Sequence, residues 1–525
     1  MTQHSPFPRC SPEAVGIPSA AIHQLLDTLE NGGFTRMHGL MIMRQGKVCA
    51  EGWWAPYAPG LHHSDHSLSK TYTATAIGLA EYEGLLRLDS RAADLLPDKM
   101  PPVLTDRLAA LTVRDILLMG AGSETEAERY PADWLEDFFA RPMEHDPGTF
   151  WRYNSHATAV LSAIVEKVSG QSMVDFLTPR LFDKIGIDAS RVLCRRGGDG
   201  TCLGGHGMFT TTEDNLRLMK LYLDGGVWEG ERLLAAQFVR DATRPLMDTI
   251  PAHAHTPWIA DNCAGYGYQI WQCRYPGAYR ADGAYGQFSV VIPSLDMIVS
   301  IHECGYLGEH MTHNELRMLK GKTGEYAPVH GPQATLNALF EILIPQVQDH
   351  PLPPCAQSDT LKNRMLRLSL PRPDGGQAAN WQAREAAMRL RADGGKISFG
   401  ILYGMSKHRT AYPGAEEITL RFGRDELEIS WTEGGVTRRL TADAQGGRRT
   451  GRLVYTQDRE VVTRIDAAAW LDSTGRLQLS LLWTETEMEN RFSFRFDGGQ
   501  AEIEKWIDSG LMGAQVREKA VYQIC

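Results

Sequence analysis

The hydrophobic pattern of the chain changes near residue 350, and this change constrains the fold more than any other feature. Before it, helical and strand patterns are mixed, whereas after it apolar residues recur at every second position, as in Ile418, Leu420 and Phe422. A period of two is typical of strands with one buried face, and the turn signals "EGG", "DSTG" and "DGG" lie between or after such runs. The sequence therefore predicts two domains, which a length of 525 residues also favours.

We place a linker at residues 351–359, where "QDHPLPPCAQSDT" is rich in proline and polar residues. The domain before it, 1–350, is expected to be α+β, with residues 304–333 as an inserted loop. The domain after it, 360–525, is expected to be an antiparallel β-barrel or sandwich. It carries no recognisable chemistry, so its expected role is to buttress the first domain, narrow its cleft or pair chains.

Charge and composition exclude several classes of function. A formal net charge of −10 gives no basic field for nucleic acid, and no apolar run approaches the roughly 20 residues that span a bilayer. The N-terminus lacks a secretory pattern. Nine cysteines without CxxC pairs indicate a reducing compartment, by default the cytoplasm, and no metal ligand pattern or cofactor motif is found.

Ser67 and Lys70, in "HSLSKTYTATAIGLA", are the first candidate catalytic residues. If a helix begins near His66, their spacing of three places both side chains on one face. A lysine amine can remove the serine proton once burial or a nearby cation lowers its pKa. The helix N-terminus can also stabilise an oxyanion. Alone, such a pair is more typical of a helix cap and a surface lysine than of a catalytic site.

Tyr153 and Ser155, in "WRYNSHATAVLSAIVEKVSG", precede a predicted helix that ends at Gly170. A phenol near a lysine can shuttle a proton between nucleophile and leaving group. The alternative is structural, with Tyr153 as a half-buried anchor and Ser155 as the helix cap.

Together, these motifs and their flanks resemble the serine β-lactamase and penicillin-binding-protein superfamily, in particular class C β-lactamase-like hydrolases. The resemblance spans about residues 11–347 and includes "LTVRDILLMGAGS" and "GGHGMFTTTEDNLRLMKLYLDGG". It implies a β-lactamase/transpeptidase-like fold, with an antiparallel sheet flanked by helices and an all-helical part. It also implies that Ser67 is the nucleophile, Lys70 its base and Tyr153 the proton shuttle.

The third motif of that family departs from the usual pattern. A lysine or histidine is expected on the strand beside the site, but the matching position reads Ala281-Asp282-Gly283. Lys322-Thr323-Gly324 is rejected as the motif because it follows the strand "MIVSIHE" and directly precedes the closing helix. The arrangement resembles aminohexanoate-dimer hydrolases and related amidases and esterases. In that comparison the N–H groups of Ser67 and Ala284 form the oxyanion hole, and Gly283 allows close approach to substrate.

The residues expected to touch substrate are Ser155, His206, Arg280, Asp282 and Gly283. Arg280 could hold a substrate carboxylate or be a solvated charge at the strand end, and His206 could aid proton transfer or make a structural hydrogen bond. Two other histidine groups, at 62–66 and 253–255, match no ligand spacing, so no metal is expected.

The sequence thus predicts a serine hydrolase that forms an acyl-enzyme on an amide or peptide bond. The substrate is expected to be a small molecule or short peptide, possibly with non-standard or D-residues. A carboxylic ester is the alternative substrate, and a non-catalytic peptide-binding relative is the alternative function. No nucleic-acid or membrane partner is expected, while a homo-oligomer is possible.

Overall fold

The computed structural model describes residues 6–126, 130–249, 260–305, 331–372, 387–400, 413–454, 463–508 and 516–525. The chain divides into two compact units. The first consists of Met1–Trp54 and Ala58–Leu368, and the second of Ala55–Tyr57 and Ser369–Cys525. Most of the expected inserted loop, the rejected Lys322-Thr323-Gly324 and the histidines at 253 and 255 lie outside the described residues.

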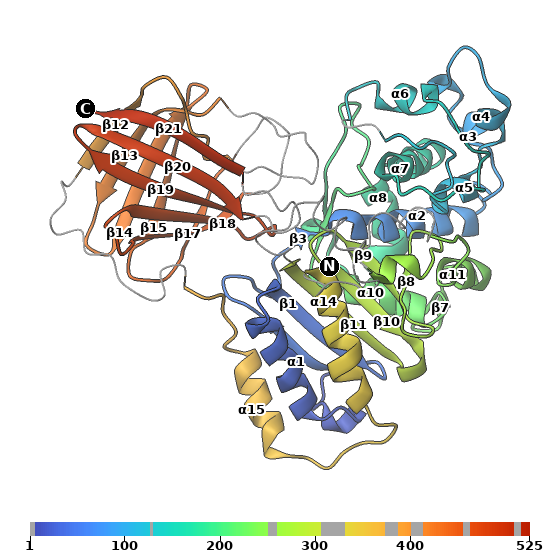
Figure 1. Ribbon diagram of the computed structural model, residues 1–525. Coiled ribbons are helices and arrows are strands. Elements are labelled where there is room, and N and C mark those ends of the chain that lie inside the picture. Colours follow the sequence, from blue (N-terminus) through green and yellow to red (C-terminus); the bar gives the residue numbers. More distant parts are fainter. Residues whose placement is uncertain are drawn as a thin grey trace, which may run out of the picture. The chain divides into compact units, whose positions relative to one another are not determined.

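A six-stranded antiparallel sheet forms the centre of the first unit (Figure 1), in the order β2-β1-β11-β10-β9-β8. Its strands are β1 (Thr35–Arg44), β2 (Lys47–Trp53), β8 (Trp271–Gln272), β9 (Tyr279–Gly283), β10 (Gln287–Ile292) and β11 (Met297–Gly305). Strands β1 and β2 form an antiparallel hairpin whose turn is Gln45-Gly46. Strand β1 is buried at nearly every position because helices cover both of its faces, and its centre, residues 40–43, is a continuous apolar run.

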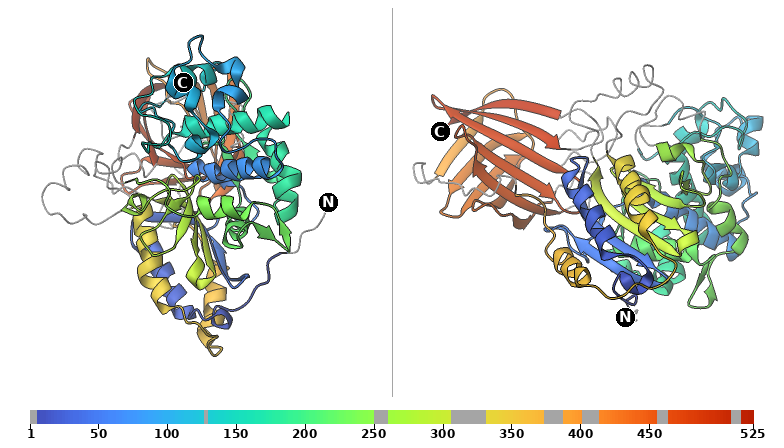
Figure 2. Two further views of the ribbon diagram at one scale, coloured as in Figure 1. Left: turned by 90° about the vertical axis from the view of Figure 1, so that its right-hand side faces the viewer. Right: turned by 60° about the horizontal axis from the view of Figure 1, so that its bottom comes forward.

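Helices cover the sheet on its two faces. Helices α1 (Ser19–Asn31) and α14 (Pro332–Ala338) lie side by side on one face (Figures 1 and 2). Helix α10 (Thr212–Leu223) packs against β1, β10 and β11 from the other face. The segment expected as a linker leads into α15 (Ala356–Met365), which contacts α1 and β2 and belongs to the first unit.

The helical part of the first unit is built around α2 (Ser69–Tyr82) and α7 (Ser155–Ser169), which pack together. The predicted end of α7 is confirmed, since Gly170 has φ 68° and donates its N–H to the carbonyl of Glu166. The predicted start needs one correction. Asn154 rather than Ser155 is the N-cap, and its side chain accepts the N–H of Ala157 at 3.0 Å.

Shorter elements complete the first unit. Its remaining helices are α3 (Ala92–Leu95), α4 (Asp106–Ala110), α5 (Val113–Leu117), α6 (Trp134–Ala140), α8 (Met173–Leu177), α9 (Asp183–Ile185) and α11 (Ala236–Ala242). Its remaining strands are β3 (His63–Ser64), β4 (Leu193–Cys194), β5 (Met208–Thr210), β6 (Val227–Trp228) and β7 (Glu231–Arg232). The order β3-β5-β4 forms a small sheet just before the Ser67 turn, which fixes one side of that turn.

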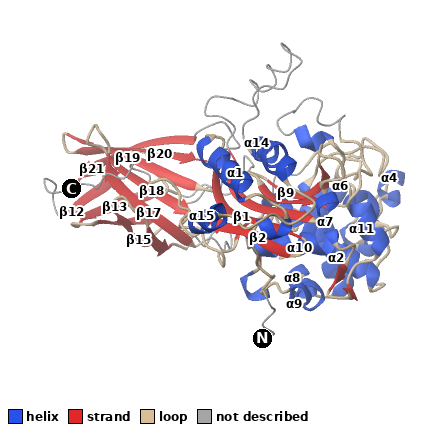
Figure 3. Cartoon of the chain, turned by 90° about the horizontal axis from the view of Figure 1, so that it is seen from below, coloured by secondary structure: helices blue, strands red, loops and turns tan. Residues whose placement is uncertain are grey.

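The second unit is a closed β-barrel (Figure 3), so of the two predicted alternatives the barrel is the one found. Its strands are β12 (Ala387–Ala392), β13 (Ala415–Phe422), β14 (Glu426–Glu433), β15 (Val436–Asp443), β16 (Arg449–Arg452), β17 (Arg464–Leu471), β18 (Leu477–Trp483), β19 (Glu489–Asp497), β20 (Gln500–Asp508) and β21 (Val516–Ile524). A parallel bridge between Asp443 and Ala468 joins β15 to β17 and closes the ring. The alternating residues Ile418, Leu479 and Phe492 are fully buried.

A short piece of N-terminal chain is part of this second unit. Ala55 forms a parallel bridge with Ser369, and its carbonyl accepts the N–H of Leu370 at 2.9 Å. The Tyr57 hydroxyl donates to the carbonyl of Thr486 at 2.9 Å. Across the described residues of both units, no helix is long and apolar enough to span a membrane.

Candidate active site

Ser67 lies in a short 3-10 turn, His66–Leu68, that leads directly into α2. The predicted helix start is therefore a 3-10 turn followed by an α-helix. The Asp65 N–H donates to the carbonyl of Met208, and the Leu68 N–H donates to the carbonyl of Asp65, both at 3.0 Å. His66 has φ 47°, a left-handed conformation that a non-glycine residue adopts only under local constraint. The turn is thus fixed on both sides of the serine.

Lys70 is almost fully buried, with 1% of its surface exposed. Its Nζ lies 3.0 Å from Ser67 Oγ and 3.2 Å from Ser155 Oγ, and it also donates to the carbonyl of Gly205. Burial lowers the pKa of Lys70 to about 7, because the protein interior disfavours the ammonium form. About half of the amine is therefore neutral near pH 7 and able to accept a proton.

Tyr153 completes the contact around the serine. Its ring stacks on Trp271 with centroids 5.6 Å apart, and Lys70 Nζ lies 4.7 Å from its centroid. Burial raises the pKa of the phenol further than its hydrogen bond with Ser67 lowers it. Tyr153 is therefore a neutral phenol at physiological pH, so it can donate a proton but does not act as a phenolate.

The contacts of Lys70 match the hydrogen-bonding capacity of a neutral amine. Such an amine has two N–H donors and one lone pair. The carbonyl of Gly205 can only accept, so one N–H points there, and a second N–H can serve Ser155. In a neutral amine the lone pair can then accept the Ser67 hydroxyl proton, and the Tyr153 hydroxyl, which is hydrogen-bonded to Ser67, can donate to Ser67 Oγ.

The β9–β10 hairpin lies against the serine turn at Gly283. A Cβ atom at this position would come within 2.1 Å of the carbonyl oxygen of Asp65, so only glycine allows the approach. Ala284 follows directly, and its carbonyl accepts a hydrogen bond from the Gln287 side chain at 3.0 Å. The same side-chain amide donates to the carbonyl of Glu303 at 2.7 Å, which ties the hairpin to β11.

The strand that departs from the family pattern presents Asp282, not a cation, to the catalytic groups. Ala281 points into the hydrophobic core and is fully buried. Asp282 lies close enough to Lys70 and Tyr153 to shift the pKa of each upward. The strand therefore contributes a carboxyl group beside Lys70 and Tyr153.

Arg280 is neither solvated nor open to a substrate carboxylate, because its side chain is fully buried and paired. Its Nε donates to Asp282 Oδ2 at 2.7 Å and its Nη1 to the carbonyl of Gln272 at 2.8 Å, while Nη2 contacts Asn262. Burial is the largest single influence and would lower the pKa of Arg280, but the combined attraction of Asp282, Cys273 and Asp261 outweighs it and raises the pKa. The hydrogen bond from Arg280 thus fixes the position of the Asp282 carboxyl group.

His206 lies in the turn that also supplies the Gly205 carbonyl to Lys70. Burial lowers the pKa of His206 well below its usual value, with Arg195 and Lys70 adding to the effect. The ring packs edge-to-face against Tyr130 with centroids 5.4 Å apart. His206 is therefore a neutral group beside the site.

The sequence prediction missed Glu126. Its Oε1 accepts the N–H of Ser155 at 2.6 Å and forms an ion-pair contact with His156 Nδ1 at 3.5 Å. Its side chain is 37% exposed, and its charge raises the pKa of Lys70. No motif or periodicity marks this glutamate in "GAGSETEAERY"; only its position in a loop between two helical patterns could have drawn attention to it.

Comparisons with known proteins identify the family of the chain and several relatives. The family model described as Beta-lactamase matches residues 19–303, which is more than half of the chain. The 6-aminohexanoate-dimer hydrolase of Paenarthrobacter ureafaciens is 28% identical over 220 residues, covering 38% of this chain and 55% of that protein. Penicillin-binding protein 4 of Amycolatopsis lactamdurans is 29% identical over 308 residues, covering 51% of this chain and 77% of that one.

Among solved structures, the penicillin-binding protein homologue from Pyrococcus abyssi aligns with 96% of this chain and 99% of its own, at 13% identity and a TM-score of 0.44. The chain spans about half the length of the first of the two sequence relatives. The match over residues 19–303 includes the Ser67 turn, α2, Tyr153, α7 and the β9–β10 hairpin. The chain belongs to the Beta-lactamase family.

Proposed function

We propose that the chain is a serine hydrolase that acts through an acyl-enzyme on an amide or peptide bond. The observation that carries the proposal is the buried amine of Lys70, 3.0 Å from Ser67 Oγ, with its pKa lowered to about 7. A neutral amine in contact with a serine hydroxyl is the arrangement that nucleophilic catalysis requires.

In the proposed reaction, Ser67 Oγ attacks the substrate carbonyl carbon while its proton moves to Lys70 Nζ. The backbone N–H groups of Ser67 and Ala284 are assigned to the developing oxyanion. Tyr153 then gives its phenolic proton to the leaving nitrogen and is reprotonated from Lys70. Water attacks the acyl-enzyme with its proton passing to the same pair, and Ser67 regains its proton as the acid is released.

An amide substrate is favoured over an ester because Tyr153 is a neutral proton donor. An amine leaving group must be protonated as the C–N bond breaks, whereas an alkoxide depends less on this step. The substrate-contacting roles proposed for Ser155, Asp282 and Gly283 follow from their contacts with Lys70, Tyr153 and the serine turn. A carboxylic ester remains the alternative substrate, and a non-catalytic binding role is disfavoured by the Lys70–Ser67 contact.

The nine cysteines are all free thiols, four of them buried. Stable free thiols are typical of a reducing compartment. We therefore propose that the protein works in such a compartment, with the cytoplasm as the first to examine.

The test is labelling by a fluorophosphonate probe, followed by a screen of amides, esters and short D- and L-peptides. Ser67→Ala should abolish both labelling and hydrolysis. The control Ser473→Ala changes an exposed serine in the barrel and should leave both unchanged. Labelling of Ser67→Ala at the wild-type rate, or its full activity on the best substrate, would overturn the proposal.

A further inference from the structure

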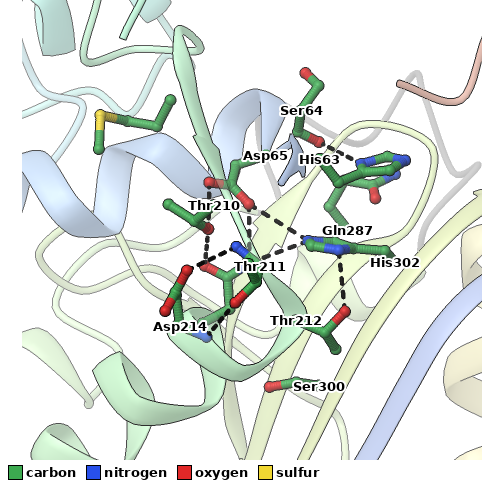
Figure 4. Close-up of polar contacts among 12 residues, drawn as sticks. His63, Ser64, Asp65, Thr210, Thr211, Thr212, Asp214, Gln287, Ser300 and His302 are labelled. Carbon is green, nitrogen blue, oxygen red and sulfur yellow. Dashed lines mark hydrogen bonds and ion pairs between the residues drawn. The ribbon is translucent and has the colours of Figure 1, made fainter. Parts of the chain in front are cut away.

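A buried polar network lies directly behind the serine turn, with Asp65 at its centre (Figure 4). Asp65 is fully buried, and its carboxyl group is contacted by Thr210 at the end of β5, Asn215 on α10 and His302 on β11. The segment before the nucleophile, the consecutive elements β5 and α10, and the more distant strand β11 therefore meet at one carboxyl group.

The contacts of the Thr210 hydroxyl show which oxygen atoms of the network must act as hydrogen-bond donors. Its Oγ1 is 2.7 Å from Asp65 Oδ2 and 3.0 Å from Asn215 Oδ1. A hydroxyl has one hydrogen, so it can donate to only one of these oxygens. An amide oxygen and a carboxylate oxygen can only accept. If Asp65 were ionised, one of the two contacts would bring two acceptors together inside the protein.

A proton on Asp65 Oδ2 resolves this conflict. Asp65 then donates to Thr210, Thr210 donates to Asn215 Oδ1, and Asn215 Nδ2 donates back to Asp65 Oδ1 at 2.8 Å. The ring of hydrogen bonds closes with every member paired. Tyr72 donates to the same Asn215 oxygen at 3.0 Å.

Reversing the Asn215 amide does not remove the need for the proton. The amide nitrogen would then face Thr210 and the amide oxygen would face Asp65 Oδ1, again at 2.8 Å. Two acceptors would be in contact unless Asp65 carried a proton on Oδ1. Both amide orientations therefore require Asp65 to be a carboxylic acid.

We propose that Asp65 is a neutral carboxylic acid in the active protein and acts as the positioning residue for Ser67. Its main chain makes the two hydrogen bonds that hold the serine turn, to Met208 and Leu68. Its carbonyl oxygen also faces Gly283 on the hairpin that carries the proposed oxyanion donor. A shift of Asp65 would move the nucleophile and this donor together.

A buried ion pair with His302 is the competing description. His302 Nε2 lies 3.5 Å from Asp65 Oδ1, and 3.1 Å from Asn215 Nδ2. In the orientation with Nδ2 as donor, His302 Nε2 accepts and Nδ1 donates to Thr212 at 3.2 Å. Burial lowers the pKa of His302 to about 3, so the ring is neutral and offers no cation to a carboxylate.

The surroundings of Asp65 include influences that raise its pKa and influences that lower it. Burial is the largest influence and raises the pKa of Asp65 to about 7. The titratable groups that face Asp65 from its own segment and from the packed elements are His62, His66, Tyr72, Asp214 and His302. The hydrogen bonds with Asn215 and Thr210 lower the pKa of Asp65, and His66 and His62 lower it to a smaller extent. Asp65 itself raises the pKa values of Tyr72 and Asp214.

The proposal predicts a loss of Ser67 reactivity on the alkaline side. Ionisation of Asp65 above about pH 7 breaks the ring, so the rate of probe labelling should fall up to tenfold per pH unit there. Asp65→Asn mimics the neutral acid, because its amide donates to Thr210 and its oxygen accepts from Asn215. This variant should label at the wild-type rate near neutral pH and keep that rate at higher pH.

Two results would overturn the proposal. The first is an Asp65→Asn variant that folds but has lost labelling at every pH, since this would mean that the carboxylate is needed. The second is a rate of probe labelling that still falls above about pH 7 in Asp65→Asn, as it does in the wild type. The control Asp349→Asn removes a carboxyl group that is 97% exposed and should leave the profile unchanged.

An infrared measurement separates this proposal from the proposed function, on which its kinetic readout rests. The spectrum of the wild type minus that of Asp65→Asn, at about pH 6, should contain the C=O band of a protonated carboxylic acid. Absence of this band would overturn the proposal even if Ser67 is fully reactive. Its presence, with no labelling of Ser67 at any pH, would overturn the proposed function alone.

Discussion

Replacement of Lys70 by methionine should abolish activity and yet stabilise the protein near neutral pH. Methionine has a similar length and no charge, so it fills the same buried space. The pKa of Lys70 falls from 10.5 in the unfolded chain to about 7 in the folded protein because of burial. Each pKa unit corresponds to about 1.4 kcal/mol, so holding this ammonium costs about 5 kcal/mol below pH 7.

The stabilisation has a definite sign and pH dependence. Between pH 7 and 10.5 the unfolded wild-type chain binds one more proton than the folded chain, so wild-type stability rises with pH over that window. Methionine removes this dependence, but it leaves the carbonyl of Gly205 without its donor, which costs about 1 to 3 kcal/mol. The variant should therefore gain about 2 to 4 kcal/mol at about pH 6 and be the less stable chain at about pH 11.

The assay is urea unfolding of wild type and Lys70→Met at both pH values, followed by tryptophan fluorescence. Lys47→Met replaces an exposed lysine and serves as the control. Its effect on the free energy of unfolding should have the same sign at both pH values. If Lys70→Met is less stable than wild type at both pH values, burial of the Lys70 ammonium group does not destabilise the folded protein, and its pKa is not lowered. The reasoning about its role as the base would then be refuted.

Three further substitutions test the rest of the site. Tyr153→Phe removes the proton donor, so hydrolysis of an amide should slow by about 10²–10⁴, with a smaller effect on an activated ester. Gly283→Ala places a Cβ within 2.1 Å of the Asp65 carbonyl and should slow acylation by about 10²–10³, because it displaces the hairpin with the proposed oxyanion donor. Glu126→Gln removes a charge that raises the pKa of Lys70, so the acidic limb of the pH–rate profile should shift to lower pH.

Each of these variants has a matched control elsewhere in the chain. Tyr222→Phe removes another buried phenol, Gly395→Ala adds a Cβ whose nearest neighbour is 3.5 Å away, and Glu124→Gln changes an exposed glutamate two residues before Glu126. The acylation rate and its pH profile should be unchanged in all three. An equal effect in a variant and its control would show that the change acts through general stability.

The strands of the barrel and the long helices were predictable because burial of one face leaves a repeating pattern. Leu427 and Ile429 are buried and alternate with half-buried residues in β14, and Val160, Leu161 and Ile164 share a face of α7. The closure of the barrel was not predictable, because it depends on one bridge between Asp443 and Ala468, which no local pattern records. The cap of α7 also differs by one residue, since Asn154 and Ser155 are both good caps and tertiary contacts assign Ser155 to Lys70.

The geometry of the site could be predicted where chemistry is tied to short spacing. Ser67 and Lys70 are three residues apart, and the structure brings them into contact. The burial of individual charged side chains could not be predicted from short spacing. Arg280 sits at a strand end, where a solvated charge is usual, yet it is buried by pairing with Asp282. Asp65 and Glu126 were missed because their partners come from elements that are distant in the chain.

The segment Ala55–Tyr57 makes the barrel depend on chain that is synthesised more than 300 residues before its main part begins at Ser369. During translation, Ala55 must wait for Ser369 and Leu370 to leave the ribosome before its partners exist, and Tyr57 must wait for Thr486. The barrel is therefore not a self-contained module. Transplanting residues 369–525 onto another protein would leave behind a part of it, so gene fusion at the apparent boundary would give an incomplete domain.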